Sequence, residues 1–190
     1  MLDYFAGGGY NTELLSRIVG PSGSVTAYYS PGGAARSAEK VALRFAGNRL
    51  ANAKQVIADV NELQLPANSL DGVLFVMAYH DLYHTPKDAT MTAANIGKIN
   101  AALFQAVKPG GVIVVVDHAA AAGGDTVKTV DDMHRIDPQV VQKDFTKAGF
   151  TFDGESTALR NTTDDHTKTV FDPAVRYKTD QFIYRFRKPA

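Results

Sequence analysis

Short apolar runs alternate with longer amphipathic stretches along most of this chain. The runs are rich in β-branched and aromatic residues and are bounded by glycine, proline or polar residues, a pattern typical of strands. Seven runs are predicted to be strands: Met1–Phe5, Val25–Tyr29, Gln55–Ala58, Leu70–Ala78, Val112–Val116, Phe150–Thr157 and Asp180–Phe186. Because helical patterns separate most of them, the order predicts βαβ units, and therefore an α/β fold with a mainly parallel sheet and helices on both faces.

Helix signals fill the gaps between these runs. Caps, proline at a first helical position and glycine beyond the last turn mark their ends. Four helices are predicted: residues 11–19 with Asn11 as the cap, residues 34–48, residues 91–107 ended by Lys108-Pro109-Gly110-Gly111, and a helix from Asp137-Pro138 to Ala148. A polar segment from Arg160 to Thr179 separates the last two strands. It is too long for a tight turn, which predicts a functional loop or lid.

Composition narrows the function classes. The 190 residues suit one domain, residues 1–190, and Lys plus Arg (20) balance Asp plus Glu (20), so no basic field favours nucleic acid or an anionic membrane. No apolar run approaches the roughly 20 residues that span a bilayer. The chain has no cysteine, which excludes disulfides and thiolate metal sites. No leader precedes the first strand, so we expect a cytoplasmic protein, or a periplasmic one if a longer precursor carries a signal peptide.

The turn Ala6-Gly7-Gly8-Gly9 after the first strand is the expected ligand site. In open α/β sheets the ligand lies beyond the strand carboxyl ends, where the winding reverses, and consecutive glycines let the backbone approach it. The dinucleotide fingerprint fits imperfectly, because Thr12 stands where a glycine or alanine is required. An ordinary tight turn is the alternative explanation of the three glycines.

Several motifs together resemble those of class I S-adenosylmethionine-dependent methyltransferases. Asp3, Gly7 and Gly9 match the acidic residue and spaced glycines of the first motif. Further matches are Ala58-Asp59, Leu70-Asp71-Gly72-Val73 and Lys108-Pro109-Gly110-Gly111. A narrower likeness to a bacterial group of predicted methyltransferases rests on Tyr79-His80-Asp81, Asp117-His118-Ala119-Ala120, His134-Arg135-Ile136-Asp137-Pro138, Asp164-Asp165-His166 and Thr179-Asp180-Gln181-Phe182. The resemblance covers nearly the whole chain.

This resemblance implies a doubly wound, mostly parallel, seven-stranded Rossmann-like sheet with an antiparallel last strand. It also implies S-adenosylmethionine as cofactor and methyl transfer to an acceptor that we expect to be a small molecule. Gly7, Gly8 and Gly9 would pass against the methionine part of the cofactor, and Asp59 would hydrogen-bond the adenine amino group. Asp3 and Tyr29 are further expected cofactor-binding residues. The segment from Asp59 to Glu62 also fits a capping box, so Asp59 has a structural explanation as well.

The sequence departs from the family pattern at two positions. Family members place an acidic residue at the end of the second strand to bind the ribose, whereas this chain has Tyr29 and Ser30 there. A neutral hydroxyl would replace a charge-assisted hydrogen bond that is about twice as strong. Phe5 stands where a first glycine is common, and we expect it to pack into the core. These departures make a catalytically degenerate cofactor-binding module the main alternative.

All five histidines fall in segments that this topology brings to the ligand-facing edge. A histidine near a carboxylate can act as a general base at neutral pH. We expect His80, beside Asp81, to be that base, His118 to orient the acceptor, and Tyr79 to line the methyl channel. The remaining expected acceptor and lid residues are His84, His134, Asp165 and His166.

The expectation for metal is that none is bound, because no complete ligand motif is present. The alternative is a metal-dependent hydrolase, in which His80 and His84 share a helical face and His118, His166 or an aspartate completes the ligand set.

The resemblance further implies helices before the first strand, and this chain begins without them. We therefore expect exposed apolar surface and self-association, with the segment 160–179 as the remaining lid carrying Asp165 and His166.

Overall fold

The computed structural model describes residues 1–87 and 91–190. Its centre is a seven-stranded sheet in the order β3-β2-β1-β4-β5-β7-β6. The strands are β1 (Leu2–Tyr4), β2 (Val25–Tyr29), β3 (Ala53–Ile57), β4 (Leu70–Val76), β5 (Val107–His118), β6 (Thr151–Ser156) and β7 (Gln181–Arg187). Pairs from β3 to β5 are parallel, whereas β7 runs antiparallel to both of its neighbours. The predicted α/β sheet and its antiparallel last strand are confirmed.

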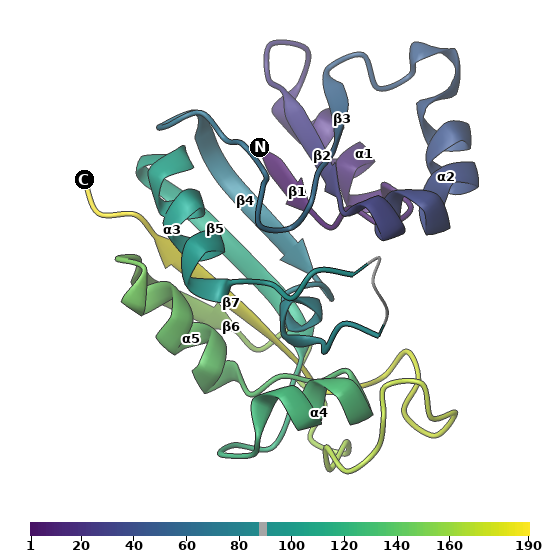
Figure 1. Ribbon diagram of the computed structural model, residues 1–190, viewed down its shortest axis with the longest axis vertical. Helices are drawn as coiled ribbons and strands as arrows, with labels where there is room; N and C mark the ends of the chain where they lie inside the picture. The colour runs from purple at the N-terminus through teal and green to yellow at the C-terminus, as the bar shows by residue number, and fades with distance from the viewer. Residues whose placement is uncertain (88–90) are drawn as a thin grey trace.

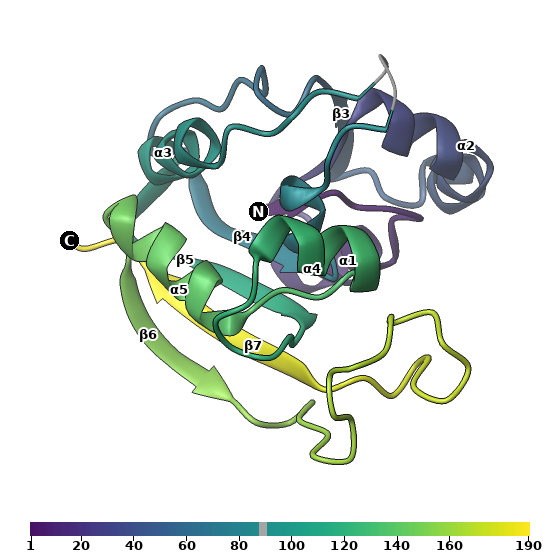
Figure 2. The ribbon, with the colours of Figure 1, turned by 60° about the horizontal axis from the view of Figure 1, so that its bottom comes forward.

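Five α-helices and two short 3₁₀ turns join these strands in the described part of the chain. They are α1 (Tyr10–Val19), α2 (Pro31–Phe45), η1 (Ala46–Asn48), η2 (His80–Tyr83), α3 (Ile96–Ala106), α4 (Thr126–Met133) and α5 (Pro138–Lys147). In Figures 1 and 2, α3 and α5 lie together along one face of the sheet, α4 lies at its lower end, and the segment 160–179 extends beyond β7. None of the described helices is long and apolar enough to cross a membrane.

Several helix boundaries differ from the predictions. Asn11 is not a cap, because α1 already begins at Tyr10 after Gly9, which adopts φ 74° and makes no side-chain cap. The third helix begins only at Ile96, where the Asn95 side chain accepts from the Lys98 N–H. Lys108 to Gly111 lie within the bounds of β5 rather than between a helix and a strand. The cap at Asp137 is confirmed, since its side chain accepts from the Gln139 N–H.

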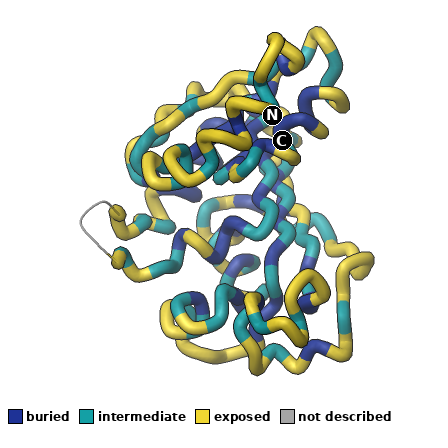
Figure 3. Tube along the Cα trace, turned by 90° about the vertical axis from the view of Figure 1, so that its right-hand side faces the viewer, coloured by how far each residue is buried: buried dark blue, intermediate teal, exposed yellow. Residues whose placement is uncertain are grey.

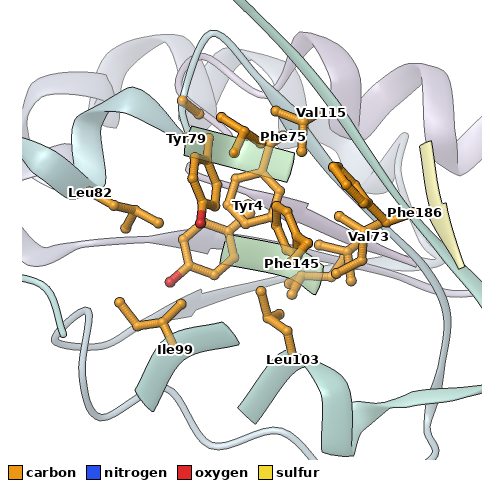
Figure 4. Packing of buried hydrophobic residues seen from close by; sticks show 14 of the residues in the cluster. Tyr4, Val73, Phe75, Tyr79, Leu82, Ile99, Leu103, Val115, Phe145 and Phe186 are labelled. Carbon is orange, nitrogen blue, oxygen red and sulfur yellow. The ribbon is translucent and has the colours of Figure 1, made fainter. Parts of the chain in front are cut away.

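The main core lies between the sheet and the helices α3 and α5. Tyr4 of β1 stacks on Phe75 of β4 with ring centroids 4.5 Å apart, and Phe145 of α5 packs on Tyr79 at 5.1 Å. Figure 4 shows these rings meeting Ile99 and Leu103 of α3. The clustered aromatic rings each bury a large apolar area, which fixes the sheet against this helical layer.

The opposite face of the sheet is covered unevenly. Val41 of α2 packs against Ala27 and Tyr29 of β2 in a smaller core. Alternate residues of β4 and β5 on this face, such as Leu74 and Val114, stay only partly buried, while their neighbours Val73 and Val115 are fully buried. Figure 3 shows the buried positions concentrated in the middle of the molecule. Apolar side chains on this face of β4 and β5 therefore remain partly open to solvent.

Candidate functional site

A cavity of about 710 Å³ lies at the carboxyl ends of the central strands. It occupies the place where the winding reverses between β1 and β4, as the fold rule predicts. Two groups of residues dominate its wall. One group lies at or just after the ends of β1, β2 and β3 and includes Phe5, Gly7, Tyr29, Ser30, Asp59 and Val60. The other includes Met77, His80, Asp81, His84, His118, His134, Val170 and Phe171.

The three glycines of the turn after β1 have different structural roles. Gly7 adopts φ 53° and lines the cavity, and a Cβ placed there would meet no atom within 4 Å. Gly9 forms the left-handed cap of α1, and the Gly8 carbonyl accepts from Arg44 Nε at 2.8 Å. Gly8 and Gly9 are not among the described residues that line the cavity, so they shape the turn that presents Gly7.

Asp3 lies beneath this turn rather than at the cavity wall. It is buried, and its Oδ2 accepts from the Thr12 hydroxyl at 2.6 Å, so it ties β1 to the first turn of α1. Burial raises the pKa of this carboxyl to about 6, although the hydrogen bonds from Thr12 oppose the shift. The arrangement gives Asp3 a positioning role for the loop. It also explains why Thr12 replaces a small residue in the glycine motif.

The end of β2 offers hydroxyl groups to the cavity. Ser30 Oγ accepts from the Gly33 N–H at 3.2 Å and caps α2, and the first residues of that helix, Pro31 to Gly33, line the cavity. Because the oxygen is used as an acceptor, the Ser30 hydroxyl proton remains available to a ligand. The buried Tyr29 hydroxyl has no hydrogen-bond partner within the described residues.

Asp59 does not form the predicted capping box, and its expected contact with the adenine amino group stays a prediction. Its Oδ1 accepts from the Asn61 N–H at 2.9 Å, two residues ahead, which is an Asx turn rather than a capping box. The Thr92 side chain and the Asn61 N–H hold the pKa of the carboxyl below its usual range. Asp59 also lines the cavity, so an ionised carboxylate faces any ligand bound beside Gly7.

His80 follows β4 and is held by Asp117 of β5. The fully buried Asp117 carboxylate contacts His80 Nδ1 at 2.7 Å and accepts from the His80 N–H at 3.0 Å and the His118 N–H at 2.8 Å. Burial lowers the pKa of the His80 ring, but the Asp117 carboxylate outweighs burial and raises it to about 9. With Nδ1 directed at Asp117, Nε2 lies 3.3 Å from Asp81 Oδ1.

His118 reaches the cavity from the end of β5 in a different electrostatic setting. Its Nδ1 lies 2.7 Å from the Thr179 hydroxyl, and burial lowers the pKa of the ring to about 4 despite the nearby Asp117. The ring is therefore neutral at pH 7, and its pKa is shifted in the opposite direction to that of His80. The two rings are neighbours, with centroids 6.0 Å apart.

His84 and His134 face each other beside His80. His84 Nδ1 lies 2.9 Å from Asp131 Oδ1 of α4, and its Nε2 lies 3.1 Å from His134 Nδ1. His134 ends α4 in the left-handed conformation at φ 54° and packs edge-on against Phe171, with ring centroids 4.8 Å apart. Non-glycine residues seldom adopt this conformation, although histidine does so more often than most.

Besides Asp3, Gly8 and Gly9, three further expected site residues lie away from the cavity within the described chain. The Tyr79 hydroxyl donates to Asp144 at 3.0 Å and accepts from Asn100 at 2.8 Å, so this side chain belongs to the core and does not line a methyl channel. Asp165 is exposed and accepts from the Thr167 hydroxyl. His166 Nε2 contacts Asp180 at 2.9 Å. The segment 160–179 does reach the cavity, but through Val170 and Phe171.

Sequence reasoning missed the residues that α4 and the segment 160–179 contribute. Helix α4 has only eight residues and buries only Val130, and sequence reasoning overlooked both the helix and Asp131. Asp125, which caps α4 by accepting from the Lys128 N–H, is the local signal that could have found it. Nothing in the local sequence distinguishes Val170 and Phe171 from other apolar residues of a polar loop.

Comparisons with known proteins identify the fold. No protein-family model and no curated protein matches the chain. Among solved structures, an S-adenosylmethionine-dependent methyltransferase from Aquifex aeolicus superposes with a TM-score of 0.65 at 17% identity, over 98% of this chain and 80% of the other. A second match is a Burkholderia thailandensis 1,6-didemethyltoxoflavin N1-methyltransferase with bound 1,6-didemethyltoxoflavin and S-adenosylhomocysteine. Its TM-score is 0.59 at 17% identity, over 100% of this chain and 70% of the other.

The cyclase SpnF is equally similar, with a TM-score of 0.64 at 16% identity over 100% of this chain and 74% of that chain. The same fold therefore occurs in more than one kind of enzyme. At sequence identities this low, the structural similarity is evidence of a shared fold only. With its strand order and glycine turn, this chain has the fold of the class I S-adenosylmethionine-dependent methyltransferases.

Proposed function

We propose that the protein transfers a methyl group from S-adenosylmethionine to a small-molecule acceptor. The observation that carries this proposal is a cavity of about 710 Å³, which joins Gly7 and Asp59 at one end to His80 and His118 at the other. Its volume lies in the range of roughly 300–1,000 Å³ that is usual for small-molecule sites. The fold favours S-adenosylmethionine as the cofactor. The histidines favour an acceptor that loses a proton during methyl transfer.

The cofactor end fits S-adenosylmethionine through three groups. Gly7 leaves open space beside its backbone, Asp59 presents a carboxylate for an adenine amino group, and Ser30 has a hydroxyl proton to donate. When bound, the cofactor supplies a methyl group on positively charged sulfur. The protein then has to hold the acceptor in line with that methyl group and exclude water.

His118 is the residue that we propose removes the acceptor proton. The sequence favoured His80, but Asp117 and Asp81 lie 2.7 Å and 3.3 Å from its two ring nitrogens. His118 Nδ1 instead contacts the neutral Thr179 hydroxyl, and its ring is neutral at pH 7. The acceptor O–H or N–H proton would pass to His118 as the new bond to carbon forms and the carbon–sulfur bond breaks. His80 and Asp81 would contact the acceptor on the other side.

Binding and turnover test the two halves of this proposal separately. Calorimetric titration with S-adenosylmethionine, its demethylated product and a nicotinamide dinucleotide should give binding of the first two only. Asp59→Asn should weaken that binding. Incubation with labelled cofactor and a panel of small phenols, amines and carboxylic acids should transfer label to one class. Tighter binding of the dinucleotide would refute the cofactor assignment.

Histidine variants then locate the chemistry. His118→Ala should lower transfer by roughly 100- to 10,000-fold, the usual contribution of a general base, without changing cofactor affinity. His166→Ala is the matched control, because His166 lies outside the cavity on Asp180. Equal loss in cofactor binding and transfer would show that His118 acts on the cofactor or on folding instead.

A cofactor-binding module without methyl transfer is the second candidate. Ser30 stands where the family pattern has a carboxylate, which weakens the expected ribose contact. Binding of the cofactor without label transfer to any acceptor class would favour this candidate.

A further inference from the structure

We propose that His80, Asp81, His84 and His134 bind a divalent first-row transition metal ion, of the type of Zn²⁺, at the acceptor end of the cavity. Each residue offers one ligand atom, and all four atoms lie within 4.8 Å of one another. The three histidines and one aspartate come from two places in the fold, η2 with the residue after it and the end of α4. The sequence alone gave no complete ligand motif, because His134 lies 50 residues beyond His84.

The spacing of the ligand atoms fits a tetrahedral ion. Bond lengths of about 2.0–2.1 Å around tetrahedral zinc place neighbouring ligand atoms about 3.3 Å apart. Asp81 Oδ1 lies 3.3 Å from His80 Nε2 and 3.6 Å from His84 Nε2, and His84 Nε2 lies 3.1 Å from His134 Nδ1. Since the widest separation stays within 4.8 Å, small side-chain rotations would close the set around one ion.

Two of the histidines carry the outer-shell partners that metal-binding histidines usually have. His80 Nδ1 contacts Asp117 at 2.7 Å, and His84 Nδ1 contacts Asp131 at 2.9 Å. A carboxylate on one ring nitrogen fixes the tautomer and leaves the lone pair of the other nitrogen for a metal. In both residues the nitrogen that does not contact the outer carboxylate is Nε2, which is the atom directed into the cluster. A hydrogen bond between His84 and His134 could form without the carboxylates of Asp117 and Asp131, so their presence is better explained by metal binding.

The donor set selects the kind of ion. Imidazole nitrogen suits Zn²⁺, Co²⁺, Ni²⁺ and Fe²⁺, whereas Mg²⁺ and Ca²⁺ prefer sites made of oxygen ligands. One carboxylate with three imidazoles therefore favours a transition metal strongly. The cluster contains no thiolate, as the chain has no cysteine.

All four ligands line the cavity, so a bound ion would face the acceptor. Four protein ligands complete a tetrahedral ion, so an acceptor oxygen or nitrogen would reach it only as a fifth ligand, beside His118, which is not part of the cluster. Metal binding itself does not rest on the proposed methyl transfer, because it can be measured with neither cofactor nor acceptor present.

The first experiment measures metal binding by the tag-free full-length chain after treatment with a chelator. Calorimetric titration with ZnCl₂ should show one ion per chain, with MgCl₂ giving no comparable binding. Titration with CoCl₂ should produce the intense visible absorption of a tetrahedral Co²⁺ site, and ZnCl₂ should abolish it by competition. If Co²⁺ gives no more than the weak absorption of a six-coordinate ion, the proposal is overturned. Equal affinity for Zn²⁺ and Mg²⁺ would overturn it as well.

Variants then assign the ligands. Asp131→Asn should weaken Zn²⁺ binding by roughly 10- to 100-fold, the usual effect of losing an outer-shell partner, and His134→Ala should weaken it at least as much. His118→Ala is the matched control, since this histidine lines the same cavity outside the cluster and should leave Zn²⁺ affinity unchanged. Far-UV circular dichroism would confirm that each variant is folded. Folded His134→Ala with wild-type affinity, or loss of binding in His118→Ala, would contradict the assigned ligand set.

Discussion

The buried carboxyl of Asp3 gives the sharpest test of how the first motif works. Asp3 is 1% exposed, and its carboxyl accepts from the Thr12 hydroxyl at 2.6 Å. Burial raises its pKa from 3.8 to about 6. The folded protein therefore binds this proton more tightly than the unfolded chain does. The stability that Asp3 contributes is present below pH about 4 and is lost as the pH rises through about 6.

Replacing Asp3 by Asn removes this pH dependence. Because proton binding is linked to folding, the free energy of unfolding of the wild-type protein should fall by roughly 2 to 3 kcal/mol between pH 4 and pH 8 through Asp3. The buried amide group costs stability too, but that cost is the same at both pH values. The free energy of unfolding of Asp3→Asn, relative to wild type, should therefore rise by roughly 2 to 3 kcal/mol from pH 4 to pH 8.

Urea denaturation at a series of pH values measures this difference directly. Asp71→Asn is the control, because Asp71 is an exposed carboxylate whose pKa is lowered by its ion pair with Lys108. Its pH dependence should be small and of the opposite sign. A relative stability of Asp3→Asn that does not change with pH would refute the argument.

Three further predictions concern the core, the segment 160–179 and the open sheet face. Tyr79→Phe should lower the free energy of unfolding by about 1–3 kcal/mol, since it removes the hydroxyl that bonds Asp144, and cofactor affinity measured by calorimetry should not change. Arg135→Met leaves the buried Asp164 carboxylate without its cation, so urea denaturation should show a loss of about 3–5 kcal/mol; a loss below 1 kcal/mol would contradict this. Self-association through the half-buried face around Val114 should appear in light scattering at high micromolar concentration, and a strictly monomeric species would count against it.

The sequence by itself determined the layers of the fold. Apolar runs of period two and helical stretches of period 3.6 identify strands and helices wherever one face of an element is buried, so the strand at Val25–Tyr29 was predicted to the residue. Local capping chemistry likewise located α5 at Asp137. The sheet order came from the family resemblance, because period and spacing do not say which strands are neighbours.

Tertiary structure alone decided how the candidate site is assembled. Tyr79 and His80 are adjacent in sequence, yet one packs into the core and the other faces the cavity, because the 3₁₀ turn after β4 directs them differently. The contact of His84 with His134 and Asp131 depends on α4 packing against η2, across a separation of about 50 residues. No local pattern encodes such a contact, since its geometry is fixed only when the whole sheet brings both segments to the same edge.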